Sequence, residues 1–198
     1  GAFEFEQLSG LNGSDGAITL ANATGQRLAL SDLNFFVGVN GAFIEDEEGN
    51  VTGIDTGEAI GFAVNGASLD IIMVKEGGAG VRSWMGVAAG VGAMGIYGLP
   101  EAFALEILEL SLRYNGKAAD GSKLDWAALA ALPGDAFGID GTSLAGITRA
   151  TDISITGKLY LNISGFVIAL ASFSIDQQSG IAVNDTQGVS IPLGTPGA

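Results

Sequence analysis

ISITGKLYLNISGFVIALASFSI, residues 153–175, is the stretch that decides the fold class. All its odd-numbered positions are apolar or glycine, and its even-numbered positions from Ser154 to Ser164 are polar. A period of two is typical of a β-strand, because successive side chains point to opposite faces of a sheet. A helix would repeat its apolar positions every three to four residues. The stretch predicts one exceptionally long strand, or a strand that bends at Gly157 and Gly165 without losing its phase.

Two segments far apart in the chain share a second pattern. Residues 28–41 read LALSDLNFFVGVNG and residues 103–116 read FALEILELSLRYNG, and both end in Asn-Gly, a good turn dipeptide. In each segment the apolar alternation reverses between the third and sixth residue, as a β-bulge would cause. We expect a strand for both. A helix over residues 100–113 is the alternative, because PEAFALEILELSL places strong helix formers after a proline.

The charge-free run 83–100 is long enough to suggest a membrane helix, but its five glycines make it a poor one. Alternating apolar residues from Met85 to Ala93 predict a buried strand instead, and no membrane insertion. Residues 42–44 and 51–54 flank an acidic turn and predict a hairpin. We therefore predict an all-β fold, an elongated antiparallel sheet or sandwich or a solenoid-like repeat. It would contain at most one short helix, at about residues 122–132, ended by Pro133-Gly134.

Internal repetition suggests how the chain is organised. Residues 2–10 read AFEFEQLSG and residues 172–180 read SFSIDQQSG, so the first strand sequence recurs near the end of the chain. Such a recurrence is typical of tandem repeats. We predict a single β-rich repeat domain over residues 1–198. In it, residues 1–10 end a preceding repeat, residues 11–180 form one full unit and residues 181–198 begin the next.

The composition excludes several classes of protein. Of 198 residues, 8 are Lys or Arg and 22 are Asp or Glu, which gives a net charge of −14 at pH 7. We expect no binding to nucleic acid, because phosphate contacts need clustered basic side chains. The chain has no His and no Cys, so Ser-His-Asp and Cys-His catalysis and imidazole or thiolate metal sites are excluded too. We expect no catalytic residues and no enzymatic activity.

Acidic residues are concentrated between residues 28 and 74, where no basic residue occurs. Glu45, Asp46, Glu48 and Asn50 supply the oxygen ligands that calcium prefers. Consecutive side chains on a strand point to opposite faces, so only a folded loop would bring these ligands together. Asp135 and Asp140 form a second candidate loop site. Calcium is the one cofactor that the sequence suggests, and a solvated acidic turn is the alternative reading.

Three segments carry a resemblance to a known family: NGASLDIIMVKE (65–76), SWMGVAAGVGAMGIYGLPEAFALEILELSLRYNG (83–116) and ITGKLYLNISGFVIALASFSIDQQSG (155–180). In this order they resemble the long repeats of very large secreted bacterial surface proteins, which often also carry hemolysin-type calcium-binding (RTX) segments. The resemblance covers residues 67–180 and rests on hydrophobicity and glycine spacing. It implies an all-β, extracellular, adhesin-like module in a tandem array, and no catalytic residues. The glycine-rich RTX nonapeptide is not in this sequence.

These observations predict a structural module of an extracellular or cell-surface array, used as a spacer, adhesin stalk or filament subunit. The expected partners are neighbouring copies of the same repeat, joined end to end through open sheet edges. A carbohydrate-binding or surface-ligand-binding module is the first alternative, because aromatic side chains can stack on sugar rings. The candidates are Trp84, Trp126, Tyr97, Tyr114 and Tyr160. A carrier of an apolar ligand is the second alternative, suggested by the hydrophobic content of 47%.

Overall fold

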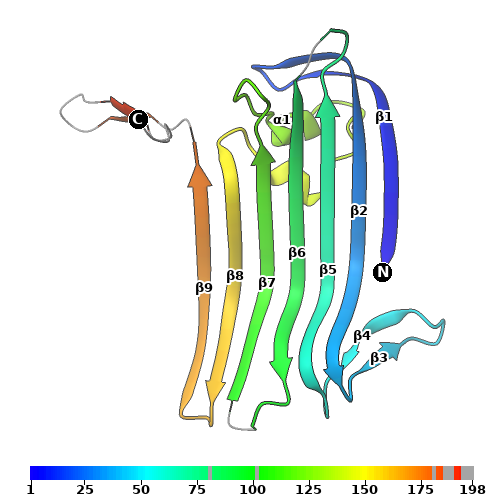
Figure 1. The fold of residues 1–198 in the computed structure, drawn as a ribbon, viewed down its shortest axis with the longest axis vertical. Coiled ribbons are helices and arrows are strands. Elements are labelled where there is room, and N and C mark those ends of the chain that lie inside the picture. The colour runs from blue at the N-terminus through cyan, green and yellow to red at the C-terminus, as the bar shows by residue number, and fades with distance from the viewer. Residues whose placement is uncertain (80–81, 101–102, 180–181, 185–189, 193–198) are drawn as a thin grey trace.

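A computed structural model describes residues 1–79, 82–100, 103–179, 182–184 and 190–192. Over these residues the protein is all-β, as predicted, and seven long strands form one antiparallel sheet in the order β1-β2-β5-β6-β7-β8-β9 (Figure 1). The strands are β1 (Ala2–Ser14), β2 (Thr19–Val39), β5 (Ile60–Lys75), β6 (Ser83–Tyr97), β7 (Phe103–Gly116), β8 (Thr151–Ile163) and β9 (Val167–Gln178). Their length makes the sheet elongated along the strand direction.

The smaller elements lie at the ends of the sheet. The predicted hairpin is confirmed as β3 (Ala42–Glu45) and β4 (Val51–Asp55), and β10 (Ala182–Asn184) pairs with β11 (Ser190–Pro192). The predicted helix is confirmed but shorter than expected, as α1 (Trp126–Ala130), and a 3-10 turn, η1 (Ser143–Gly146), follows it. The predicted start of a next repeat, residues 181–198, falls largely outside the described residues.

The alternating stretch 153–175 is a hairpin, so the prediction of one very long strand is wrong. Ile163 pairs with Val167 across a turn in which Ser164 and Gly165 have φ values of 52° and 70°. The predicted bend at Gly165 is therefore a complete reversal, whereas Gly157 lies inside β8 and pairs with Phe173. The phase survives because the three-residue turn brings odd-numbered residues of both strands to the same face.

Residues 103–116 form strand β7 and not the alternative helix, but one of the two predicted turns is wrong. Asn40 has a φ of 61° just after β2, as a turn residue should. Asn115, in contrast, lies in β7 opposite Gly86 and is buried. Its side-chain amide donates to the carbonyl oxygens of Leu124 and Thr148. Tertiary hydrogen bonds therefore hold in a strand a dipeptide whose local preference is a turn.

A row of irregularities crosses the middle of the sheet. Asp32 in β2, Gly66 in β5 and Glu109 in β7 have φ values of 53°, 63° and 53°, and the regular pairing of β6 with both neighbours skips Gly92. A bulge reverses the alternation of side chains along its strand. The predicted bulge in β2 is confirmed at Asp32, and the bulge in β7 lies at Glu109, slightly later than predicted.

The row explains why the apolar positions change parity within single strands. In β5 one face carries odd-numbered apolar residues from Met73 to Leu69 and even-numbered ones from Val64 to Ile60, whereas Ile72 and Val74 belong to the other face. Strands β8 and β9 keep odd-numbered apolar positions throughout, and their pairing with each other is regular across this level. The reversals in β2, β5, β6 and β7 therefore keep their apolar residues on the same face as those of β8 and β9. We call this face the open face and its reverse the covered face.

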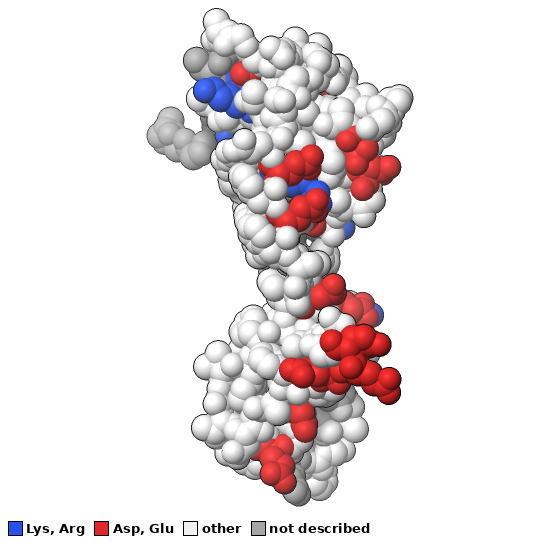
Figure 2. Space-filling model, turned by 90° about the vertical axis from the view of Figure 1, so that its right-hand side faces the viewer, with Lys and Arg blue, Asp and Glu red and all other residues white. Residues whose placement is uncertain are grey.

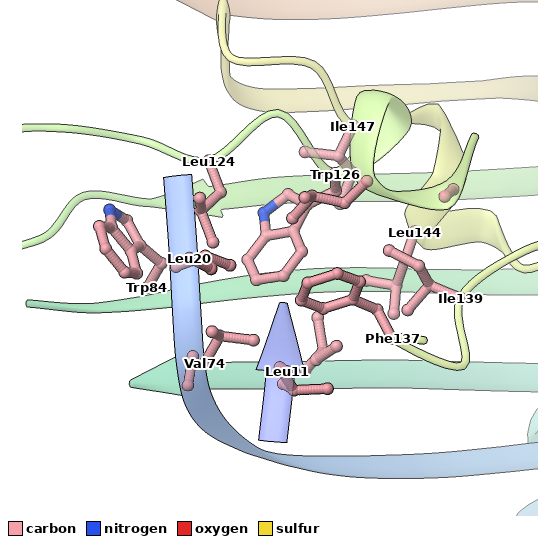
Figure 3. Packing of buried hydrophobic residues seen from close by; sticks show 14 of the residues in the cluster. Leu11, Leu20, Val74, Trp84, Leu124, Trp126, Phe137, Ile139, Leu144 and Ile147 are labelled. Atoms are coloured by element: carbon pink, nitrogen blue, oxygen red, sulfur yellow. The ribbon is translucent and has the colours of Figure 1, made fainter. Parts of the chain in front are cut away.

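The hydrophobic core lies on the covered face, at the end of the sheet where α1 and η1 pack (Figure 3). The loop between β7 and β8 brings large side chains down onto the strands. Its fully buried residues are Leu124, Trp126, Leu129, Phe137, Ile139, Leu144 and Ile147. The strands contribute Leu11, Leu20, Ala23, Ile72, Val74, Trp84 and Ala88. Gly86 leaves room for this packing, because a Cβ there would lie 3.0 Å from the ring of Trp126.

Candidate functional site

The acidic turn predicted to bind calcium connects β3 and β4, at the opposite end of the sheet from α1 (Figure 1). The Asp46 side chain stabilises the turn, because its Oδ1 accepts hydrogen bonds from the backbone N–H groups of Glu48 and Asn50. The bond from the Asn50 backbone N–H is the main cause that lowers the pKa of Asp46. Glu45 and Glu48 are exposed. The four predicted ligands thus share one turn.

The second predicted site lies in a different loop, before η1. Asp135 Oδ1 accepts hydrogen bonds from the backbone N–H groups of Ile139 and Asp140. Asp135 therefore also closes its own turn, with a φ of 43°. In the described part of the chain, no group of three or more acidic side chains lies close enough to hold a metal ion. Calcium binding at either loop stays a prediction.

A buried polar cluster that the sequence did not predict ties the α1 loop to the sheet. The Asp15 carboxylate accepts hydrogen bonds from the backbone N–H groups of Ala17, Ile18 and Asp125, and it lies 2.6 Å from the Arg149 guanidinium. Burial alone would raise the pKa of Asp15, but these hydrogen bonds outweigh it and the pKa is lowered. All the partners are structural groups of the same chain, so the cluster fixes the fold.

A similar pair joins the loop to β8. Lys123 is buried, and its Nζ lies 3.0 Å from Asp152 Oδ1 and donates to the Thr151 carbonyl oxygen. Burial opposes ionisation of Asp152, but hydrogen bonds from Lys123 and Ser179 lower its pKa overall. Lys123 and Asp152 are 29 residues apart in the sequence. Local residue spacing therefore does not indicate that they pair.

Two of the five aromatic residues proposed to stack on sugars are unable to do so. Trp84 and Trp126 are in the hydrophobic core, with exposed fractions of 2% and 0%. The Trp126 indole N–H donates to Asn115 Oδ1. Tyr114 lies on the open face, opposite Ile153 and Val87. Tyr97 and Tyr160 lie on the other face, so the described structure does not gather these aromatic residues into one platform.

The open face is the largest feature with no partner among the described residues. Its large side chains come from all seven strands. Fourteen of the nineteen exposed large hydrophobic residues lie on it: Phe3, Phe5, Phe35, Val37, Val39, Ile60, Met73, Ile96, Phe103, Tyr114, Leu159, Ile163, Val167 and Ile175. Apolar surfaces of this extent are rare on isolated proteins and are typical of interaction surfaces.

The charges lie on the other face. Arg27 bridges Glu4 and Asp70 on the covered face, and Lys158 pairs with Glu109 at the row of bulges. Among the described residues, no Asp or Glu is paired at an open-face position of the strands. Lys75 lies at the rim of this face, and Lys117 and Asp152 line a pocket at the same end with Tyr114 and Ile153. Figure 2 views the sheet edge-on, with the open face to the left, and the acidic groups lie toward its centre and right.

The two long edges of the sheet are also unpaired. Within the described residues β1 pairs only with β2, and β9 only with β8. Such edges are templates for pairing with another strand. Both edge strands contain the recurring sequence that predicts a repeat, in residues 2–10 of β1 and residues 172–178 of β9. The recurring sequence thus coincides with the edges of the sheet, whereas the continuous apolar face between them has no such signal in any single segment.

Comparison with protein-family models, with curated proteins and with solved structures finds no match to this chain. The helices of the described residues include none that is long and apolar enough to cross a membrane.

Proposed function

We propose that the chain is a structural repeat module of an extracellular array, and that its sheet continues from one copy to the next. The observation that carries this proposal is the equivalence of the two edge strands. Because the sheet is antiparallel and has seven strands, β1 and β9 run in the same direction. A strand in the position of β9 can therefore take the position of β1 in a following copy.

The side chains of the two edges support this equivalence. Phe3, Phe5 and Gln7 of β1 lie on the open face. Phe173, Ile175 and Gln177 of β9 lie on the same face, at the matching positions of the recurring sequence. The alternating positions match as well, since Glu6 and Asp176 are both acidic and both lie on the covered face. In a tandem array β2 of the next copy would pair with β9 as β2 pairs with β1 here.

This arrangement assigns the module a mechanical role. Each copy would add six strands to one sheet and would contact only its neighbours, as in other repeat proteins. The contact is heterologous, so each copy leaves an edge strand to which a further copy can be added. An extracellular spacer, adhesin stalk or filament subunit needs such a contact. Calcium held by the turn around Asp46 would stiffen the array, and this belongs to the same proposal.

Hydrogen exchange of a two-copy chain tests the proposal. Residues 11–180 are repeated directly after residue 180, and β9 of the first copy is compared with β9 of the single chain. We expect the outward-pointing backbone N–H groups of β9 to become protected, because β2 of the second copy now pairs with them. A matched control joins two complete chains through a flexible linker of Gly and Ser. Equal exchange of β9 in the direct repeat and in the single chain would contradict the proposal.

A further inference from the structure

We propose that the open face binds the open face of a second copy, so that two sheets pack face to face and form a dry two-layered core. This inference concerns the face of the sheet and not its edges, and it does not depend on the tandem array. It starts from a simple contrast. The covered face has a core of its own at one end, whereas the open face exposes large side chains along the full length of the strands.

The area is sufficient for a stable dimer. Strand β1 lies beside only the part of β2 nearer α1, so six strands about 4.8 Å apart make the face about 24 Å wide along its length, and the 13 residues of β8 extend about 43 Å. Each copy would then contribute roughly 1,000 Å², or about 2,000 Å² for the pair, which is at the lower end of the range of obligate dimers. Aligned sheets pack about 10 Å apart with their strands crossing at about 30°. An antiparallel face of this size meets that geometry.

Side chains of the open face differ in length from strand to strand, which would allow them to interdigitate with those of a second sheet. The open-face residues of β6 include the short side chains of Val87, Ala89 and Val91. The neighbouring columns carry longer ones, such as Leu69 in β5 and Leu112 in β7. Long side chains of a crossing sheet can occupy the space above a column of short ones, as in the cores of β-sandwiches.

The charge distribution favours a second copy over an anionic lipid surface. The net charge of −14 repels anionic membranes. Two copies that meet through their open faces keep their acids on the two outer surfaces, as Figure 2 shows for one copy. Side chains at the α1 end of the face are polar: Gln7 and Gln26 lie near Lys75, and Gln177 lies on the opposite edge strand, β9. An apolar centre with a polar rim is typical of protein interfaces.

The row of bulges keeps the apolar residues on the face that the second copy would cover. Without the reversals at Asp32, Gly66, Gly92 and Glu109, the apolar residues of four strands would change faces in mid-sheet. Bulges with a positive φ at a non-glycine residue are costly, as at Asp32 and Glu109. Their alignment across the sheet preserves one continuous apolar surface, which a partner must cover.

Sedimentation velocity on the complete chain tests this dimer. Ala89→Glu places a carboxylate in the middle of the open face, on the inner strand β6. In the free chain this carboxylate is hydrated, but in the dimer it would be buried without a partner. Thr156→Glu is the matched control, because it places the same group on the covered side of the inner strand β8. Neither position lies at an edge, so edge pairing is left intact in both variants.

We expect the unsubstituted chain and Thr156→Glu to sediment as dimers with dissociation constants within about threefold of each other. Ala89→Glu should raise the dissociation constant by about 100-fold or more, with unchanged secondary structure by circular dichroism. A monomeric unsubstituted chain would overturn the proposal, and so would three equally stable dimers, which would assign association to the edges. Lipid extracted from a monomer and absent from Ala89→Glu would also overturn it, in favour of an apolar ligand.

Discussion

The two faces of the sheet are built from the same strands but are stabilised in different ways. On the covered face α1, η1 and their loop bury a small set of large side chains completely, and hydrogen bonds satisfy buried groups such as Asn115. On the open face more apolar side chains are present, but none of the described elements covers them. Burial by the chain itself therefore accounts for the fold of one face, and the other face depends on what it meets.

The largest expected difference between the faces is in the cost of truncating an aromatic residue. Trp126→Ala removes a fully buried side chain and its hydrogen bond to Asn115, so it should lower the free energy of unfolding by about 3–5 kcal/mol. Tyr114→Ala, at a partly exposed site on the open face, should cost less than about 1 kcal/mol in the monomer. Urea unfolding at dilute concentration measures both. Similar losses would show that the open face is already buried within one chain.

The polar anchors of the covered face should make its stability depend on pH. The folded-state pKa values of Asp15 and Asp152 are lowered, so their contribution is present above the unfolded value of 3.8 and is lost as pH falls through the folded values. We expect the free energy of unfolding to fall on their account as the pH is lowered from 6 to 3. Urea titrations at both pH values measure it.

Asp15→Asn is the control for that pH effect. The amide keeps the shape of the side chain but loses the charge that faces Arg149. This variant should be less stable at pH 6 and should lose less stability on acidification. An unchanged pH dependence in the variant would assign the effect to other carboxylates, such as Asp120 or Asp176, whose pKa values hydrogen bonds also lower.

Most strands of the sheet could be predicted from the sequence, but the chain reversal at Gly165 and the long-range hydrogen bonds of Asn115 could not. Alternation from Ile153 to Ile175 fixed both the strands and their shared face, because period two is a local property of the backbone. It did not reveal the reversal at Gly165, since an odd-length turn preserves the parity. The Asn-Gly dipeptide predicts a turn at Asn115, but hydrogen bonds to Leu124 and Thr148 of the α1 loop hold this residue in a strand. Long-range hydrogen bonds leave no trace in spacing.

The predicted sites show the same limit. Asp46 and Asp135 were selected as oxygen ligands, and the structure places both carboxylates in hydrogen bonds that close their own turns. Acidic residues in turns are frequent for this local reason. The open face, in contrast, was present in the sequence as apolar positions of seven strands, but its continuity depends on how four bulges align. That alignment is a property of register between strands and not of any one segment.

Calcium binding can be tested at the β3–β4 turn, which lies at the end of the sheet opposite α1. If the turn around Asp46 binds the ion, millimolar calcium should raise the melting temperature relative to a chelator, because binding to the native state alone stabilises it. At 100 times the dissociation constant the gain is about 2.7 kcal/mol. Glu48→Gln should reduce the shift, and Asp140→Asn should leave it unchanged if this turn is the site. Identical melting curves with calcium and chelator would remove both loops from consideration.

The smallest expected effect concerns the row of bulges that keeps the two faces distinct. Asp32 has a φ of 53°, a conformation that glycine adopts without steric cost and that β-branched residues adopt least well. Asp32→Gly should change the free energy of unfolding by less than about 1 kcal/mol, whereas Asp32→Val should lower it by about 1–2 kcal/mol. Urea unfolding compares the two. If valine is tolerated as well as glycine, the bulge in β2 is not fixed by this residue, and β2 can present its apolar side chains without the reversal at Asp32.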